Sequence, residues 1–394
     1  ASPSGQVSYA WNTSAVPQGK YWIYGVIGDG LNTSRGYARG PLIISHYTGA
    51  PEIKLSKSVL NFGAQLGGPA SNTESVLITN TGTGTLGWQA AALQSWITVS
   101  PASGTGDGKI SVGVNTAGLY AGSFQGQVRI TDPNALNSPR YIAVNLTVYA
   151  AGYDPPPFGA FDTPTNGASV SGSISVSGWA LDTIGVKKID IKRAADPADP
   201  GSVIGADGLV FIGEAIIVKG ARSDIEALYP NYPMADRAGW GYMLLTYGLP
   251  RQGNGTFVLY AIAEDLNGNR TTLGSKLITS NNASRTQPFG NIDTPGQGGI
   301  ASSTGYVNFG WALTPLPNII PTDGSTIWVG VDSVLIGHPV YNLYRADIAG
   351  GFPGYLNSNG AVGYYELDTT KYSNGTHTIG WFVIDSAGNS DGMG

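Results

Sequence analysis

The sequence predicts an all-β protein built as an extended tandem array of β-sandwich domains. The first observation is composition: 58 glycines and 24 prolines occur among 394 residues, and only 12% of the residues are charged. Together with an aromatic content of 10%, this composition is typical of short strands joined by many turns. The length suits about two to four domains, each with a core of its own.

A repeated strand-and-turn unit is the second observation. The stretch Asn254–Asn269 recurs at Asn374–Asn389 and, more faintly, at Gln18–Asn32, and in each copy ten positions separate a glycine from an aspartate. A glycine turn, an apolar run rich in aromatic and β-branched residues, and an Asp/Gly/Asn turn together predict a buried strand that enters a hairpin. The chain is therefore expected to contain several similar β units.

Residues 1–48 match the end of this unit without its beginning. Trp11–Gly19 aligns with Leu367–Gly375, and we expect Pro41–Ser45 to be the closing strand after the hairpin. The segment is therefore predicted to be the C-terminal half of a sandwich domain. Two explanations are open: it is a piece excised from a longer chain, or it is a half-domain that another element completes.

Residues 49–150 are predicted to form a separate sandwich. In Tyr141–Tyr149, apolar and polar residues alternate, which is typical of a strand with one buried and one solvated face. The block Ser95–Gly104, followed by a glycine-rich strand pair in Gly118–Ile130, resembles the BACON family of immunoglobulin-like sandwiches. The resemblance implies an extracytoplasmic module that is often attached to carbohydrate-active or surface proteins. We expect Trp96, the tryptophan of this block, to lie in the core.

Two copies of one domain are predicted at residues 151–283 and 284–394, the first beginning with the proline-rich linker Asp154–Pro157. Pro157–Pro164 matches Pro288–Pro295, and the tetrapeptide Gly-Trp-Ala-Leu occurs in both copies. These copies resemble the immunoglobulin-like domains of tandem bacterial surface proteins. Because few residues follow the last Asp/Gly/Asn turn, we expect the second copy to lack its closing strand.

Each copy carries an Arg-x-Asp pair in a long connection: Arg222 with Asp224, and Arg345 with Asp347. We expect these pairs to tie the connection to the sandwich, and partner binding is the alternative. Ser223 and Glu226 have the spacing of a capping box, so a short helical turn is predicted there.

The residue types argue against catalysis, and we predict that the chain is not an enzyme. Cysteine is absent, and the three histidines, His46, His338 and His377, lie in no zinc-protease motif; no nucleophile elbow is present. Because His377 aligns with Phe257 in the repeated strand, we expect it to be packed.

The expected surroundings of the protein follow from charge and hydropathy. A net charge of −5 with scattered basic residues offers nothing to a phosphate backbone, so nucleic acid is not an expected partner. No apolar stretch of the sequence is long enough to span a membrane. Low charge with abundant Gly, Ser, Thr, Asn and Tyr favours an extracellular or bacterial cell-surface location.

Two kinds of ligand site are compatible with the sequence. Aromatic residues with polar tips crowd the long connections, and they form the candidate ligand-binding set: Trp240, Tyr242, Tyr229, Tyr232, Tyr364 and Tyr365. Filling of an enlarged core is the equally open alternative. Asp265, Asn267 and Asn269 alternate oxygen ligands as calcium loops do, so calcium is the one candidate metal ion. An Asp/Asn/Gly turn explains the same residues without a metal, and we favour that explanation. No other cofactor is predicted.

The sequence therefore favours a non-catalytic extracellular scaffold, adhesive or filament-forming protein of the cell surface. The alternative is a carbohydrate-binding accessory region of a secreted polysaccharide-degrading enzyme. The expected partner is protein, through self-association or neighbouring modules of a longer chain, and polysaccharide is the second candidate. An incomplete first segment and an incomplete last domain would complement one another in a head-to-tail fibre. A longer tandem chain is the explanation that we favour.

Overall fold

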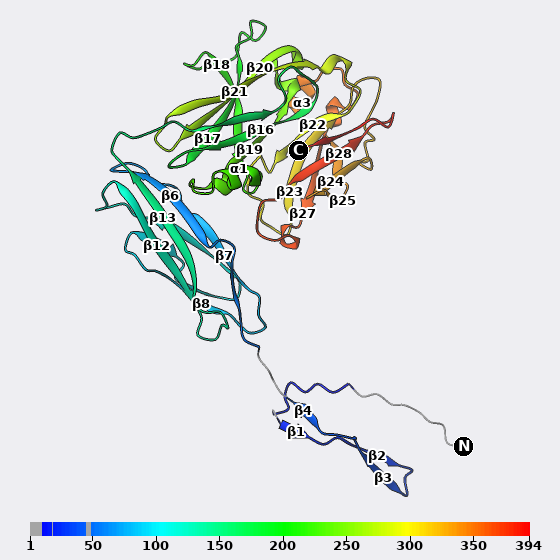
Figure 1. The fold of residues 1–394 in the computed structure, drawn as a ribbon. Helices are drawn as coiled ribbons and strands as arrows, with labels where there is room; N and C mark the ends of the chain where they lie inside the picture. The colour runs from blue at the N-terminus through cyan, green and yellow to red at the C-terminus, as the bar shows by residue number, and fades with distance from the viewer. Residues whose placement is uncertain (1–9, 18, 45–48) are drawn as a thin grey trace.

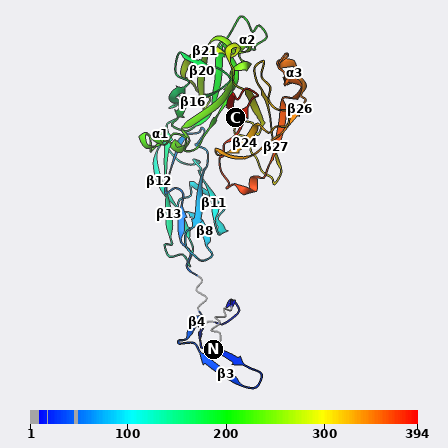
Figure 2. The ribbon, with the colours of Figure 1, turned by 90° about the vertical axis from the view of Figure 1, so that its right-hand side faces the viewer.

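Residues 10–17, 19–44 and 49–394 are described by the computed structural model, and they form three β-sandwiches preceded by a segment of short strands (Figure 1). The all-β class and the tandem array of immunoglobulin-like domains are confirmed. The array is not a straight row, because the third sandwich lies beside the second (Figures 1 and 2). The N-terminal segment lies at one end of the first sandwich, and the second sandwich contacts the other end.

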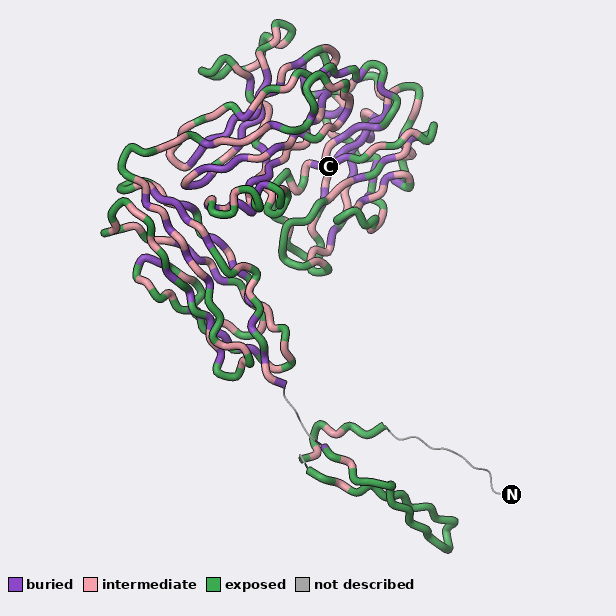
Figure 3. The backbone as a smooth tube through the Cα atoms, viewed as in Figure 1, coloured by how far each residue is buried: buried purple, intermediate pink, exposed green. Residues whose placement is uncertain are grey.

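The N-terminal segment has little apolar burial. It contains two antiparallel pairs: β1 (Gly19–Tyr21) with β4 (Leu42–Ile44), and β2 (Tyr24–Gly28) with β3 (Thr33–Tyr37). Most of its side chains are exposed (Figure 3), including Ile27 at 80% and Tyr37 at 69%. In its described part, this segment has strands of a sandwich but no second sheet that covers them.

The first sandwich packs a five-stranded sheet on a four-stranded sheet. In spatial order, the five-stranded sheet consists of β10 (Ser103–Thr105), β8 (Gly87–Ala92), β12 (Gly122–Thr131), β13 (Arg140–Tyr149) and β6 (Val59–Gln65). The four-stranded sheet consists of β5 (Ile53–Leu55), β7 (Glu74–Asn80), β11 (Gly108–Val114) and β9 (Ile97–Ser100). The predicted alternation in β13 is confirmed, and Trp96 is packed in the core as expected.

The second sandwich joins eight strands in one hydrogen-bonded order around a single core. In that order they are β14 (Phe158–Thr163), β16 (Ser173–Leu181), β19 (Gly239–Leu245), β18 (Leu209–Ile217), β17 (Val186–Ala194), β20 (Asn254–Asp265), β21 (Arg270–Asn281) and β15 (Ala168–Val170). β20 is the organising strand of the sequence, and it turns at Asp265 into β21, as predicted. The turn labelled α2 (Pro250–Gly253) leads into β20.

The third sandwich packs two four-stranded sheets. In spatial order these are β22 (Phe289–Thr294), β23 (Tyr306–Leu313), β27 (Val362–Leu367) and β26 (Val340–Leu343), and then β25 (Val334–Gly337), β24 (Ile327–Val331), β28 (Ile379–Ile384) and β29 (Ser390–Met393). The prediction that this domain lacks its last strand is wrong, because β29 pairs antiparallel with β28. The few residues after the turn are enough for a strand of four residues, whereas β21 has twelve.

Short helices lie in the long connections. α1 (Ser223–Leu228) confirms the predicted helical turn, and α3 (Ala346–Gly351) is its counterpart in the third sandwich. The predicted capping box is wrong: the N-cap residue of α1 is Arg222, and no side chain caps this end. Ser223 is already the first helical residue, so its hydroxyl is one position too late for the cap.

The first and second sandwiches are docked on one another through buried polar contacts. Ser71 donates its hydroxyl to the carbonyl of Ile184, which belongs to the second sandwich. Gly63 approaches so closely that a Cβ there would lie 1.8 Å from the carbonyl oxygen of Thr183. Such a contact admits only glycine, so the two domains share a fixed interface.

An ion pair between these domains strengthens the same interface. The Lys57 ammonium of the first sandwich lies 2.8 Å from a carboxylate oxygen of Asp236 in the second, and it also bonds Glu74 of its own domain. Burial opposes the charge on Lys57, but its bonds to the two carboxylates outweigh this effect and raise its pKa. The charge on Lys57 is therefore kept at the interface.

Candidate binding surfaces

Trp240 lies in the core of the second sandwich, so its prediction as a ligand-binding residue is wrong. Its side chain is 3% exposed, and its ring lies 5.8 Å from that of Phe161, measured between centroids. Trp240 on β19 pairs with Gly178 on β16, and a Cβ at Gly178 would lie 2.5 Å from the indole. The glycine of the Gly-Trp-Ala-Leu motif thus makes room for a tryptophan.

The third sandwich fills the matching space from another strand. Its motif glycine, Gly310, pairs with Gly363, which stands where the second sandwich has Trp240. Trp381 on β28 lies against both glycines and is 1% exposed. Its counterpart in the repeat, Ala261, is small. Each sandwich therefore places one tryptophan in the same space, and for Trp240 the alternative of core filling is confirmed.

Three further residues of the predicted set are partly buried and do not form one surface. Tyr242 lines a cavity of about 600 Å³ between the second and third sandwiches, and burial raises its pKa. Tyr365 packs on the core of the third sandwich and donates its hydroxyl to the carbonyl of Ile336. Tyr364 is its neighbour on β27 and is also half-buried. The structure does not bring these three together into one surface.

Tyr229 and Tyr232 belong to an aromatic cluster at the edge of the second sandwich. Their ring centroids lie 5.6 Å apart, and each lies 5.4 Å from the ring of Phe158. Tyr229 also lies 5.7 Å from Trp179. All four rings are half-buried. Of the predicted ligand-binding residues, these two tyrosines alone share a surface.

The residues of the calcium prediction form a closed turn. Asp265 is 1% exposed, and its Oδ1 accepts from the backbone N–H groups of Asn267 and Asn269. Its Oδ2 accepts from the side-chain amide of Asn269. The same contacts recur at Asp385 and Asn389. Protein donors therefore occupy both oxygens of Asp265, and a role for calcium stays a prediction.

The Arg-x-Asp pairs tie the connections to the sandwiches, as predicted. Arg222 donates to Asp224, two residues away, and to Asp162 on β14. Arg345 makes the matching bonds to Asp347 and to Asp293 on β22. Asp162 and Asp293 are the aspartates of the repeated Asp-Thr-Pro motif. The repeat therefore preserves a three-residue link.

A tyrosine and an arginine join the second sandwich to the third. The ring of Tyr247 stacks on Phe289 with centroids 3.8 Å apart and an interplanar angle of 9°. The Arg285 guanidinium bonds the carbonyl of Ser171 in the second sandwich, the carbonyl of Pro288, and Asp391 on β29. The end of the second sandwich is therefore covered by its neighbour.

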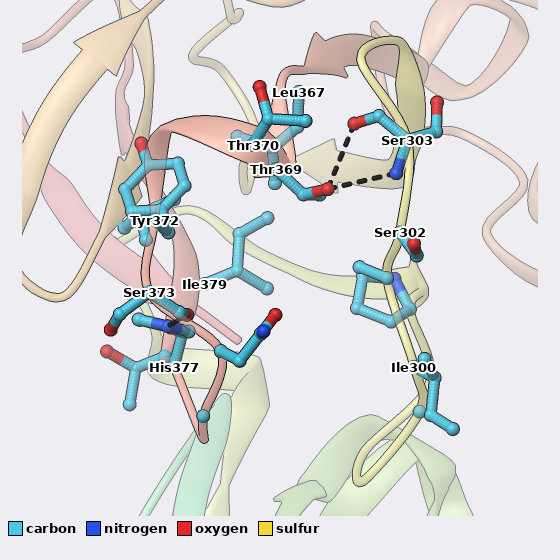
Figure 4. A pocket seen from close by; sticks show the side chains of 17 residues that line it. Ile300, Ser302, Ser303, Leu367, Thr369, Thr370, Tyr372, Ser373, His377 and Ile379 are labelled. Carbon is cyan, nitrogen blue, oxygen red and sulfur yellow. Dashed lines mark hydrogen bonds between the residues drawn. The ribbon is translucent and has the colours of Figure 1, made fainter. Parts of the chain in front are cut away.

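At the matching end of the third sandwich there is an open cavity of about 810 Å³. Figure 4 shows two loops that face one another across it, one with Ile300 and Ser303 and the other with Thr369 and His377. Two hydrogen bonds join Thr369 and Ser303. The Thr369 hydroxyl donates to the Ser303 carbonyl at 2.9 Å, and the backbone N–H of Ser303 donates to the Thr369 hydroxyl. In the second sandwich, Thr246 makes the matching bond to the carbonyl of Gly172.

His377 is exposed on the wall of this cavity, so the prediction that it is packed is wrong. Its Nδ1 lies 2.6 Å from a carboxylate oxygen of Asp332, and its Nε2 lies 2.7 Å from the carbonyl oxygen of Ser373. The bond to Asp332, helped by that carbonyl, raises the pKa of His377. The aligned Phe257 is buried because β20 is paired along its whole length, whereas β28 begins only at Ile379.

Sequence reasoning missed the cavity and the interface residues Lys57 and Arg285. A lone lysine or arginine carries no pattern, so these two had no signal. The cavity did have a signal in the sequence. The repeat matches Thr246 with Thr369, and it matches β15 with Gly299–Ala301. That alignment places an unpaired strand position beside residues 299–301.

One family comparison bears on the first sandwich. Residues 52–128 match a family described as the viral BACON domain. This segment is therefore similar to a BACON domain. The match ends within β12, and the sheet of the first sandwich continues through β13 to Tyr149. BACON and immunoglobulin-like modules are typically non-catalytic and typically extracellular.

Solved structures resemble the chain only distantly. A Bacteroides ovatus GH5 xyloglucanase in complex with a heptasaccharide is 14% identical over 42% of this chain, with a TM-score of 0.22, and the chain spans 30% of that enzyme. Fibronectin(III)-like modules of Clostridium thermocellum CbhA are 13% identical over 60% of this chain and 91% of theirs, with a TM-score of 0.19. The human desmocollin-1 ectodomain is 11% identical over 95% of this chain and 63% of its own, with a TM-score of 0.21. No curated protein matches the chain in sequence.

The described residues lack two further features. They bring no group of three or more His, Asp or Glu side chains into an arrangement that could hold a metal ion. Within the same residues, none of the helices has the length and apolar character that crossing a membrane requires.

Proposed function

We propose that this protein is a non-catalytic structural protein of the bacterial cell surface or extracellular space that assembles with other copies of itself. The observation that carries the proposal is the N-terminal segment, whose strands and connections expose apolar side chains. Trp22 is 57% exposed and Leu31 is 95% exposed. Exposed apolar residues gathered on one element are typical of a protein-binding surface.

The docked sandwiches support a mechanical role. The Lys57–Asp236 ion pair and the stack of Tyr247 on Phe289 fix the relative positions of neighbouring domains. Interfaces that are small and polar leave domains free to move, whereas buried stacks and ion pairs with close backbone contact do not. Rigid spacing is what a scaffold or filament subunit requires.

Sedimentation of the full chain tests this proposal. Multimers should grow with protein concentration, and deletion of residues 1–48 should leave a monomer. As a control, the substitution Val203→Ser changes a side chain that is 85% exposed in a loop of the second sandwich and should leave assembly intact. A full chain that stays monomeric at every concentration contradicts the proposal.

The carbohydrate-binding alternative has one supporting observation, the half-buried cluster around Tyr229 and Tyr232. Aromatic rings with exposed faces are a common feature of sugar-binding surfaces. Polysaccharide pull-down separates the two functions: saturable binding that is lost in Tyr232→Ala favours the accessory role. Trp240→Ala is no longer a useful probe, because it would damage the core.

A further inference from the structure

Three charged side chains with little exposure meet where the first sandwich docks on the second. Lys57 lies in the turn between β5 and β6, Glu74 is the first residue of β7, and Asp236 lies in η1 (Ala235–Arg237) of the second sandwich. Their side chains are 19%, 4% and 8% exposed, respectively. An amine that contacts two buried carboxylates supplies the two groups from which an amide bond is made.

Lys57 contacts the two carboxylates in different ways. Its ammonium donates a hydrogen bond to Glu74. Its Nζ also lies 2.8 Å from Oδ2 of Asp236, but this buried oxygen has no hydrogen-bond partner in the described part of the chain. Buried polar atoms are nearly always hydrogen-bonded, so this exception calls for an explanation. The amine is therefore close to the Asp236 carboxylate without the geometry of a hydrogen bond.

Another partly buried lysine shows the usual arrangement. Lys188 in the second sandwich donates to both carboxylate oxygens of Asp190, at 3.0 and 3.1 Å. Such bonds stabilise the charged pair, because each oxygen has a donor. The Lys57–Asp236 contact lacks this feature, which sets it apart from an ordinary ion pair of the same protein.

Burial brings the neutral forms of the two groups within reach. Burial opposes the charge on Lys57 and on Asp236. Attraction between the two still raises the pKa of Lys57 and lowers that of Asp236, so the ion pair is the resting form. Because removing two charges from water is costly, the neutral amine and acid lie closer in free energy to the ion pair here than they do in water.

We propose that Lys57 and Asp236 react to form an amide bond that joins the first sandwich covalently to the second. This inference goes beyond the function proposed above and does not depend on self-association. Nζ of Lys57 attacks Cγ of Asp236, a C–N bond forms, and Oδ1 of Asp236 leaves as water. An ammonium and a carboxylate together contain all the atoms of the amide and the water, so the reaction consumes no oxidant, cofactor or activated substrate.

Two neighbouring side chains are placed to assist the reaction. Glu74 accepts one proton from the Lys57 ammonium and returns it to the departing oxygen, and a second proton passes to that oxygen from the attacking nitrogen. Nζ of Lys219 lies 3.5 Å from Oδ2 of Asp236, where its charge stabilises the oxyanion that forms during the attack. A cavity of about 480 Å³, lined by Lys57, Glu74 and Asp236, receives the water that is released.

The fixed interface keeps the reacting groups together. The side-chain amide of Asn61 donates to the carbonyl of Pro230 at 2.9 Å, and Gly63 lies directly against the backbone of Thr183. Groups that are positioned in this way react as if present at effective concentrations of up to about 10⁵–10⁸ M. This positioning is what an amine and an unactivated carboxylate need in order to condense. Once formed, the bond prevents the two sandwiches from separating.

Intact mass under denaturing conditions tests the proposal. The full chain should be lighter than its sequence requires by the mass of one water molecule. A proteolytic digest should contain a branched peptide that joins Lys57 to Asp236. A chain that keeps its full mass after prolonged incubation in the folded state overturns the proposal. A branched peptide that joins Lys57 to Glu74 overturns it as well.

Lys57→Arg is the decisive variant, because it keeps the positive charge but has no amine that can form the bond. It should have the full mass of its sequence. A loss of water that persists in Lys57→Arg comes from another site and contradicts the assignment. Lys188→Arg is the matched control: it changes the lysine that is bonded to both oxygens of Asp190, and it should lose water as the natural chain does.

Glu74→Gln tests the proton transfer. The variant leaves Lys57 and Asp236 in place but removes the base, so bond formation should slow by about 10²–10⁴-fold. The fraction of freshly synthesised chain that has lost water, followed over time, measures the rate. An unchanged rate in Glu74→Gln overturns the role given to Glu74.

This test and the sedimentation test of self-association fail separately. A monomeric chain that has lost one water molecule contradicts the proposed function and supports the amide bond. Multimers of a chain with full mass support the proposed function and overturn the amide bond.

Discussion

The second and third sandwiches are two copies of one domain, and they differ at three linked places. The core tryptophan comes from β19 in one and from β28 in the other. The strand after the Asp/Gly/Asn turn has twelve residues in one and four in the other. One end is covered by a neighbouring domain, and the matching end holds a cavity. The comparison shows that the repeat preserves positions and contacts, while the residue that fills a position changes.

The two core tryptophans also differ in their polar surroundings. The Trp381 indole donates to Asn308 at 2.7 Å, and Asn308 is fully buried. The counterpart of Asn308 in the second sandwich is Val176. Within the described residues, the indole N–H of Trp240 has no hydrogen-bond acceptor. The third sandwich therefore provides an acceptor for the indole N–H of its core tryptophan, whereas the second sandwich does not.

The largest expected effect is the loss of either tryptophan. Trp381→Ala and Trp240→Ala should each lower the unfolding free energy of their own sandwich by about 3–5 kcal/mol, because each leaves a large internal cavity. Hydrogen exchange resolved by domain measures the two losses separately. Phe382→Ala, on the same strand as Trp381 but 39% exposed, is the control and should cost much less. Equal effects of Trp381→Ala and Phe382→Ala contradict this account of the core.

Asn308→Val should have a smaller effect. The substitution copies Val176 and leaves the Trp381 indole without its acceptor, so the third sandwich should lose about 1–3 kcal/mol of unfolding free energy. Denaturant titration followed by tryptophan fluorescence measures the change. Val176→Thr in the second sandwich is the reverse test, because it keeps the shape of the side chain and adds a hydroxyl at this position. An unchanged midpoint for Asn308→Val would show that the hydrogen bond is dispensable.

The two arginine ties should contribute less still. Arg222→Ala and Arg345→Ala should each lower the unfolding free energy by at most about 1 kcal/mol, because these ion pairs are partly solvated. The bonds from Arg222 lower the pKa of Asp224 to about 2. Because this pKa is lower in the folded state, the contribution of the tie is present above pH 3.8 and is lost as the pH falls through about 2. Melting temperatures of wild type and Arg222→Ala should therefore converge in acid. A difference that persists at the lowest pH contradicts the tie.

The smallest expected effect is a pH dependence of local stability around His377 in the third sandwich. The bond to Asp332 raises the pKa of His377, so its contribution is complete below pH 6.5 and is lost as the pH rises through the raised value. The protection factors of amides in residues 373–378, which compare the measured exchange rate with the intrinsic rate at the same pH, should therefore fall above neutral pH. His377→Phe copies Phe257 of the second sandwich and should remove this dependence. If the dependence survives in His377→Phe, another group is responsible.

Repeat matching predicted more of this protein than any single motif did. The hairpin at Asp265, the alternation in β13 and the Arg222 tie followed from spacing and periodicity, and the core position of Trp96 followed from the usual burial of a large aromatic residue in a strand. The predictions that failed concerned particular side chains: Trp240 as a surface residue, His377 as a packed one, and Ser223 as a cap. Each of these depends on which neighbour lies against the residue, and spacing along the chain does not contain that information.

By itself, the sequence determined the class of the fold, the order of the domains and the positions of the turns, because backbone preferences and apolar periodicity act locally. Tertiary structure alone decided which aromatic residue fills each core, since a tryptophan on β19 and one on β28 reach the same space. It also decided which domain end is covered and which is open. Long-range pairing of β15 with β21 closes one end, whereas residues 299–301 belong to no strand in the described part of the third sandwich.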